Sequence, residues 1–259
     1  MPQIHPTAII DSKAEIAEDV SIGPFTIIGA DVSIASGCRI GSFCVLQGFT
    51  ELGPDNEIYT GAVIGSPPQD VGFKGKKSFI KIGSGNKIRE YITINPGTEE
   101  RTTTFIGNNN MIMAYSHIAH DCNVGSNCIL ANAATLAGYV DIEDYAVIGG
   151  LVAVHQFVRV GKYSIVGGCS KVVQDIPPFS TCDGHPAKIY GLNLVGLRRA
   201  NFTKQQIRIL HSIFNILFFS NLNHKNALTQ IQDEFGDFQL TQDFVDFFKT
   251  SKRGMSKCR

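Results

Sequence analysis

The chain has 259 residues, and its 23 lysine and arginine residues balance 23 aspartate and glutamate residues. That length suits one large domain or one domain with an appendage, and the neutral balance gives no global reason to expect nucleic acid or an anionic membrane as a partner. The seven cysteines are odd in number and lack C-x-x-C spacing, which excludes a complete set of internal disulfides and disfavours a zinc ribbon.

The N-terminal segment MPQIHPTAII has neither a basic start nor an apolar core of signal-peptide length. The most apolar later run, IFNILFF, is too short to cross a bilayer. We therefore expect a cytoplasmic protein with reduced thiols that is not an integral membrane protein.

A repeat of six residues dominates the first two thirds of the chain. Every sixth residue is aliphatic from position 4 to 64, from 82 to 94 and from 106 to 172. The residue after the aliphatic one is often glycine, and the fourth residue after it is usually small. The two breaks fall at SPPQDVGFKGKKSF and PGTEERTTT.

A strict hexapeptide repeat is typical of a parallel β-helix, in which each hexad forms a short strand and a turn. Three hexads, about eighteen residues, would close one triangular coil. The aliphatic and small residues then point inward, which makes Cys38, Cys44, Cys122 and Cys128 core filler. Glycine after the aliphatic residue is expected to relieve the turn through a positive φ.

The hexads stop near residue 178. The pattern predicts a mainly β protein, with a β-helix over 1–178 that carries loop insertions at 66–79 and 96–104. Residues 179–259 are predicted to form a Pro/Gly-rich connector and a small α-helical domain. Its helices are expected at 203–221, 223–235 and 241–249, the first with Thr203 and Gln206 as a capping box. The basic end KTSKRGMSKCR is expected to be frayed.

Residues eighteen apart in uninterrupted coils should lie one above another, about 4.8 Å apart. The polar columns predicted in this way are His120–Gly138–Gln156, Asp121–Tyr139 and His117–Thr135–Ala153–Lys171, with His155 beside Gln156. All of these positions face outward in the repeat. The segments HIAHDC, LAGY and HQF are therefore predicted to build one polar patch on the outside of the β-helix.

Three interpretations of this patch compete. It could be solvated surface, although the convergence of polar, glycine and aromatic residues at one edge disfavours that. A zinc site could be imagined from His117, His120 and His155, but Asp121 and Gln156 suit hydrogen bonding better. We therefore expect an acid–base site without a metal.

The segments HIAHDC, ILANAATLAG, IGGLVAVHQF and VGGCSKVVQDIPP resemble the acyl-carrier-protein-dependent UDP-N-acetylglucosamine acyltransferases, which begin lipid A synthesis. The resemblance covers nearly the whole chain, including DNEIY, GSPPQD and GLNLVGLRR. It implies left-handed coils, a homotrimer with its sites between subunits, and no cofactor. It also implies an acyl carrier protein thioester as donor, docked with help from the helical domain, and a UDP-sugar as acceptor.

The resemblance also implies roles for individual residues. His120 matches the general base, and the ordinary histidine pKa of about 6.5 suits proton transfer at neutral pH. Asp121 would orient that histidine, and the Gly138 N–H would stabilise the oxyanion. The residues implied to hold the sugar nucleotide are Gln69, Asp70, His117, Tyr139, His155, Gln156, Asn193, Arg198 and Arg199. Because family sites lie between subunits, the loop with Gln69 and Asp70 could belong to a neighbour.

Three positions depart from the family pattern. Tyr139 stands where the family usually has histidine, Val195 where it has an acidic residue, and Lys171 where it has glycine.

Lys171 bears on the length of the acyl chain. It lies near Gly150 and Gly168, two positions without side chains that are expected to line the bottom of an acyl groove. Three coils separate Lys171 from His117, roughly 14 Å. At about 1.3 Å per carbon, set by a C–C bond of about 1.5 Å, this height predicts a 3-hydroxyacyl donor of about twelve carbons.

Two alternatives stay open at this point. The acceptor could be a 3-amino rather than a 3-hydroxyl sugar nucleotide, which would give an amide product. More remotely, the chain could be a non-catalytic β-helix scaffold, although a scaffold has no reason to keep a base, an oxyanion glycine and a glutamine in one column.

Overall fold

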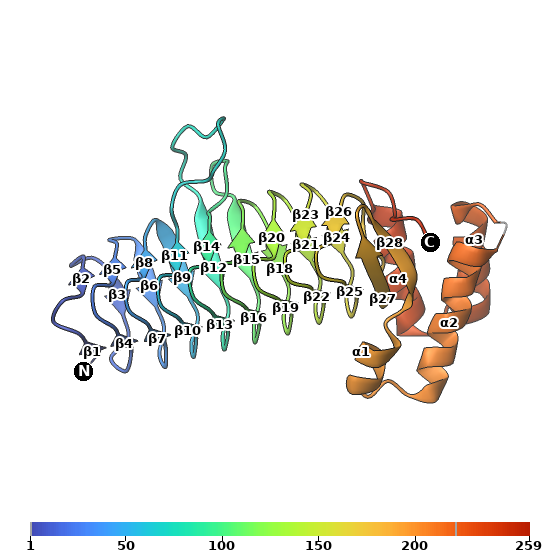
Figure 1. The fold of residues 1–259 in the computed structure, drawn as a ribbon, viewed down its shortest axis with the longest axis horizontal. Helices are drawn as coiled ribbons and strands as arrows, with labels where there is room; N and C mark the ends of the chain where they lie inside the picture. The colour runs from blue at the N-terminus through green and yellow to red at the C-terminus, as the bar shows by residue number, and fades with distance from the viewer. Residues whose placement is uncertain (1, 221) are drawn as a thin grey trace.

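Short strands and turns wind into a parallel β-helix that ends in a group of helices in the computed structural model, which describes residues 2–220 and 222–259 (Figure 1). The strands form three sheets of 11, 9 and 8 strands, one for each face of the triangular coil. The predicted architecture, a β-helix of hexapeptide repeats followed by a small helical domain, is confirmed.

The first sheet contains β1 (Gln3–Ile4), β4 (Ser21–Ile22), β7 (Arg39–Ile40), β10 (Glu57–Ile58), β13 (Lys87–Ile88), β16 (Met111–Ile112), β19 (Ile129–Leu130), β22 (Val147–Ile148), β25 (Ile165–Val166), β27 (Ser180–Gly184) and β28 (Ala187–Leu192). The second contains β2 (Ile9–Ile10), β5 (Ile27–Ile28), β8 (Val45–Leu46), β11 (Val63–Ile64), β14 (Thr93–Ile94), β17 (His117–Ile118), β20 (Thr135–Leu136), β23 (Ala153–Val154) and β26 (Lys171–Val172). The third contains β3 (Glu15–Ile16), β6 (Val32–Ile34), β9 (Phe49–Leu52), β12 (Phe79–Ile82), β15 (Thr103–Ile106), β18 (Asn123–Val124), β21 (Asp141–Ile142) and β24 (Arg159–Val160).

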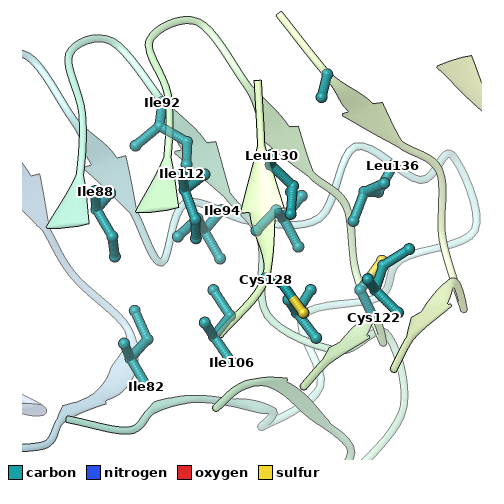
Figure 2. Packing of buried hydrophobic residues seen from close by; sticks show 14 of the residues in the cluster. Ile82, Ile88, Ile92, Ile94, Ile106, Ile112, Cys122, Cys128, Leu130 and Leu136 are labelled. Carbon is teal, nitrogen blue, oxygen red and sulfur yellow. The ribbon is translucent and has the colours of Figure 1, made fainter. Parts of the chain in front are cut away.

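The inward-facing ladder of aliphatic residues forms the core, as predicted. Ile94, Ile118 and Leu136 are each 0% exposed and lie above one another in successive coils. Cys122 and Cys128 fill the same interior (Figure 2). Burial raises the pKa of each of these two thiols to about 12, so both stay protonated and act as small apolar side chains.

The glycines that follow the aliphatic residues do not serve as positive-φ turns, with Gly65 as the exception. They permit close approach between coils instead: a Cβ on Gly23 would lie 2.8 Å from the carbonyl carbon of Gly41. Positive φ falls two residues later, mostly on residues with side chains, such as Phe25 and Tyr139. Aromatic stacking between coils helps to offset the cost of that conformation.

Both loop insertions leave the same corner of the triangle, between the second and third sheets. The first lengthens its coil, so that the paired residues Asn56 and Asn86 are 30 apart. The second gives a spacing of 24 between Asn86 and Asn110, against 18 elsewhere. The loops end slightly earlier than predicted, because Phe79 begins β12 and Thr103 begins β15. Figure 1 shows them projecting together from the β-helix.

The connector is more regular than predicted. The strands β27 and β28 form an antiparallel hairpin that extends the first sheet. A short helix, α1 (Leu194–Arg199), follows within the segment expected to be irregular. The remaining helices are α2 (Lys204–Phe219), α3 (His224–Phe235) and α4 (Gln239–Thr250). The capping box of α2 is present, its predicted last residue, Asn221, lies outside the described residues, and α4 begins two residues before its prediction.

The basic C-terminus is ordered rather than frayed, which corrects the sequence prediction. Asp175 is fully buried, and its carboxylate accepts hydrogen bonds from the Ser251 hydroxyl at 2.6 Å and the Arg159 N–H at 2.8 Å. Met255 and Cys258 form isolated bridges to the body of the fold. Backbone pairing, which composition does not reveal, therefore holds the tail. Among the described helices, none has the length and apolar character needed to cross a membrane.

Candidate active site

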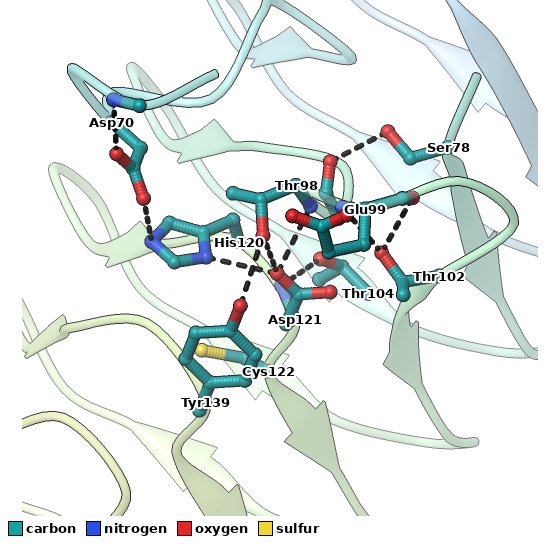
Figure 3. A network of polar contacts seen from close by, with 12 residues as sticks. Asp70, Ser78, Thr98, Glu99, Thr102, Thr104, His120, Asp121, Cys122 and Tyr139 are labelled. Carbon is teal, nitrogen blue, oxygen red and sulfur yellow. Dashed lines mark hydrogen bonds and ion pairs between the residues drawn. The ribbon is translucent and has the colours of Figure 1, made fainter. Parts of the chain in front are cut away.

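His120 lies at the corner from which the two loops project, in the turn after β17. Its side chain points away from the β-helix core, as the repeat predicts, yet the residue is only 5% exposed. Asp70 of the first loop and Thr98 of the second lie beside it (Figure 3). The side chain is therefore outward-facing but not exposed, because the loops cover this part of the outer face.

Asp121 fixes the orientation of the His120 ring. The carboxylate Oδ2 lies 3.0 Å from Nδ1 of His120. It also accepts hydrogen bonds from the Thr98 N–H at 3.0 Å and the Thr98 hydroxyl at 2.8 Å. Burial raises the pKa of Asp121, but the hydrogen bonds from nearby threonines and His120 outweigh burial and hold that pKa below its usual value.

An ionised Asp121 sets the tautomer of its neighbour. Because the carboxylate can only accept, Nδ1 of His120 carries the proton, and Nε2 is left as the basic nitrogen. The closest charged group to Nε2 is the carboxylate of Asp70, at 3.9 Å. That distance is too long for a hydrogen bond, so Nε2 is available to a bound group.

Gly138 stacks on His120, as predicted from the eighteen-residue repeat. A Cβ at this position would lie 2.3 Å from Cε1 and 2.5 Å from Nε2 of the imidazole. Only glycine therefore leaves room for the ring. In the described part of the chain the Gly138 N–H donates to no protein acceptor, so it is a free donor beside the imidazole.

Thr98 is a site residue that the sequence reasoning missed. Its hydroxyl donates to Asp121 and contacts the Tyr139 hydroxyl at 2.9 Å. The repeat places the start of the second loop one coil from the histidine, because Thr93 pairs with His117, but it does not place the Thr98 hydroxyl within that loop. The Thr104 hydroxyl also contacts Asp121, because it accepts a hydrogen bond from the Asp121 N–H at 2.8 Å.

The first loop contributes Asp70 within the same chain, so a neighbouring subunit is not needed to place it beside His120. A hydrogen bond of 2.7 Å from the Gly72 N–H to Oδ1 holds the Asp70 carboxylate. Gln69 is exposed next to it.

The other predicted ligands along this edge differ in burial. Nδ1 of His117 and the Thr93 hydroxyl share a hydrogen bond of 2.7 Å. Burial is the main cause that lowers the pKa of His117, and the charge of His120 is the second. His155 and Gln156 are exposed, side by side, two coils above the segment with His117 and His120. No group of three or more histidine, cysteine or acidic residues with a metal-binding arrangement occurs within the described residues.

Asn193, Arg198 and Arg199 lie elsewhere, at the C-terminal end of the molecule (Figure 1). The Asn193 amide is engaged within the chain: it caps α1 by accepting from the Gly196 N–H, and it donates to the Tyr163 carbonyl. The two arginines are exposed in the last turn of α1. A single chain therefore does not bring them to His120.

The column above His117 follows the predicted register through Thr135 and Ala153 to Lys171, which is exposed. Gly150 and Gly168 stack at the neighbouring corner, where a Cβ on Gly168 would lie 3.3 Å from the Gly150 carbonyl oxygen. These positions lie along one side of the β-helix.

An oriented imidazole with a free Nε2, next to an unused backbone N–H, can accept a proton while a negative oxygen develops nearby. That combination suits attack of a hydroxyl or amine on an acyl group.

Comparison with known proteins supports this chemistry. Residues 175–256 match the family model described as UDP-N-acetylglucosamine O-acyltransferase domain 2, and residues 103–138 match the bacterial transferase hexapeptide repeat. The acyl-[acyl-carrier-protein]–UDP-N-acetylglucosamine O-acyltransferase of Thermodesulfovibrio yellowstonii is 46% identical over 100% of both chains. The enzyme so named from Aliarcobacter butzleri is 41% identical over 98% of both.

Solved structures of similar proteins lead to the same assignment. LpxA from Acinetobacter baumannii superposes with a TM-score of 0.94 at 38% identity, covering 98% of this chain and 100% of that one. The UDP-N-acetylglucosamine acyltransferase from Bacteroides fragilis gives the same TM-score and identity over 98% of this chain and 99% of that one. The fold is accordingly the left-handed parallel β-helix of hexapeptide transferases. This chain belongs to the family of acyl-[acyl-carrier-protein]–UDP-N-acetylglucosamine O-acyltransferases.

Proposed function

We propose that the protein transfers a (R)-3-hydroxyacyl chain from acyl carrier protein to the 3-position of a UDP-N-acetylglucosamine-type nucleotide, the first step of lipid A biosynthesis. The observation that carries this proposal is the buried His120–Asp121 pair beside the free Gly138 N–H. Membership of the acyltransferase family supports the same reaction.

In the proposed reaction, Nε2 of His120 removes the proton from the acceptor group as that group attacks the thioester carbonyl carbon. A bond forms between acceptor and acyl carbon, and the carbonyl oxygen becomes an oxyanion that accepts a hydrogen bond from the Gly138 N–H. The C–S bond then breaks, and the imidazolium returns its proton to the departing thiolate. Asp121 keeps the imidazole oriented and stabilises its charged form.

We further propose that the working enzyme is a cytoplasmic homotrimer in which a neighbouring subunit completes the site. Arg198 and Arg199 are exposed on α1, away from their own His120, and guanidinium groups suit a diphosphate. Gln69, Asp70, His117, His155 and Gln156 lie along the corner and face near His120, where a sugar nucleotide would contact them.

The helical domain is proposed to dock the acidic acyl carrier protein. Lys225 and Lys249 line a pocket between α3 and α4, and Arg198 and Arg199 add positive charge on α1. Such a surface steers an acidic partner at a rate that falls as salt is added.

The decisive experiment is steady-state kinetics of the purified enzyme with (R)-3-hydroxyacyl carrier protein and two acceptors, UDP-N-acetylglucosamine and its 3-amino analogue. Ester formation supports the 3-hydroxyl acceptor, and a preference for the amine would assign the amide-forming reaction. If neither acceptor is acylated, the proposed function is wrong.

The Gly138→Ala variant is expected to lose about 10²-fold in kcat, because the methyl group would displace the imidazole and misplacement of about 1 Å costs that much. The backbone N–H stays in place, so the loss would report ring position. Gly29→Ala, where the nearest atom to a Cβ would be 3.3 Å away, is the matched control and should remain active. Normal turnover of Gly138→Ala would contradict the stacked geometry.

Exhaustive treatment with EDTA is expected to leave turnover unchanged, because a base and an oxyanion donor are both supplied by the protein itself. Measuring initial rates before and after chelation checks this. Loss of activity that zinc restores would instead favour a metal-dependent reaction and overturn the proposed roles.

A further inference from the structure

Two hydroxyl groups connect Tyr139 to the carboxylate that orients the base. The Thr98 hydroxyl has one hydrogen, and it points to Asp121 Oδ2 at 2.8 Å. The 2.9 Å contact between the Thr98 and Tyr139 oxygens must therefore use the tyrosine hydrogen. The direction of both hydrogen bonds is therefore fixed: Tyr139 donates to Thr98, and Thr98 donates to Asp121.

The tyrosine is held in place for this contact. Its ring stacks on Phe157 of the next coil, with centroids 4.7 Å apart and planes 9° apart. Its edge meets the His120 ring at a centroid distance of 5.2 Å and an angle of 87°. Figure 3 shows the hydroxyl directed toward Thr98. With its hydrogen committed to Thr98, the Tyr139 hydroxyl can only accept a hydrogen bond from a sugar, the ligand that the family resemblance implied for position 139.

We propose that Thr98 and Tyr139 are positioning residues that tune the base through Asp121, by a relay of hydrogen bonds from Tyr139 to Thr98 to Asp121 to His120. This inference rests on the proposed role of His120 as the general base. Each donor draws negative charge from the carboxylate, which lowers the carboxylate's hold on the Nδ1 proton. The second loop thereby sets how readily His120 gains a proton at Nε2.

The sign of the effect follows from the charges around the imidazole. Asp121 faces Nδ1, Asp70 lies 3.9 Å from Nε2, and His117 lies on the strand that leads to His120. Removing a donor from Asp121 leaves more negative charge facing Nδ1, which favours the imidazolium. In a variant without the Thr98 hydroxyl, His120 should therefore become protonated at a higher pH than in the wild type.

The test uses Thr98→Val, Tyr139→Phe and the double variant in the full-length enzyme. Thr98→Val removes the hydroxyl but keeps the backbone N–H that donates to Asp121 at 3.0 Å. We expect the acidic limb of the kcat/KM profile to move up by roughly half a pH unit to one unit. Tyr139→Phe should move it in the same direction by less, because its hydroxyl acts through Thr98. In the Thr98→Val background, Tyr139→Phe should add nothing.

The control is Tyr145→Phe. Tyr145 occupies the same position of the next hexad, with φ of 61°, and stacks on Tyr163 at 4.6 Å. Its hydroxyl makes no hydrogen bond to the described residues, so its removal should leave the profile unchanged.

A second readout separates the relay from the assignment of the base. In enzyme labelled with 13C at histidine Cε1, the His120 resonance should titrate at higher pH in Thr98→Val than in the wild type. If the resonance shifts but the kinetic profile does not, the relay stands and His120 is not the base. If well-folded Thr98→Val and Tyr139→Phe move neither, or if their effects add in the double variant, the relay is wrong.

Discussion

Replacing His120 with alanine is expected to lower kcat by about 10²–10⁴-fold, the usual range for loss of a general acid–base group. The reason is geometric. Nδ1 is engaged with Asp121 at 3.0 Å, so Nε2 is the nitrogen free to receive a proton. The measurement is turnover of purified enzyme at saturating donor and acceptor.

Folding should survive this substitution. The ring is buried at the corner, but Asp121 keeps both hydrogen bonds from Thr98, and the aliphatic core is separate from the site. The free energy of unfolding is expected to fall by no more than about 2 kcal/mol. His120→Asn is the matched variant, because its amide can still donate to Asp121 but cannot act as a base. Near-normal turnover of either variant would remove His120 from the proposed mechanism.

Most of the β-helix could be predicted because one rule repeats. A period of six places Ile94, Ile118 and Leu136 in one buried column, and a period of eighteen places Gly138 over His120. Neither statement needs knowledge of distant contacts, since each coil rests only on its neighbours. The proposed oxyanion donor, the Gly138 N–H, was placed beside the proposed base, His120, by the same arithmetic.

Several features that depend on non-repeating segments could not be predicted. The repeat shows that position 120 faces outward, but it does not show that two loops cover it and leave it 5% exposed. It contains no information about the Thr98 hydroxyl, which reaches Asp121 from a loop of irregular conformation. Composition and periodicity likewise do not indicate that Asp175 is buried and holds the C-terminal tail.

The acyl donor preferred by the wild type is expected to have about twelve carbons, because Lys171 stands three coils above His117. The register from His117 through Thr135 and Ala153 to Lys171 is that of parallel strands, which sets the height at roughly 14 Å. An extended chain that advances about 1.3 Å per carbon reaches this height after eleven or twelve carbons. Gly150 and Gly168 leave the neighbouring corner without side chains two and three coils above His117.

Lys171→Gly is therefore expected to accept longer donors. Each further methylene that becomes buried contributes about 0.8 kcal/mol, so two should raise the kcat/KM ratio of fourteen to twelve carbons by about tenfold or more. The assay compares hydroxyacyl carrier proteins of ten to sixteen carbons on wild type, Lys171→Gly and the control Lys87→Gly, which removes a strand lysine from another face. The control should keep the wild-type preference. If Lys171→Gly keeps it too, the lysine side chain turns into solvent and another group sets the length of the acyl chain.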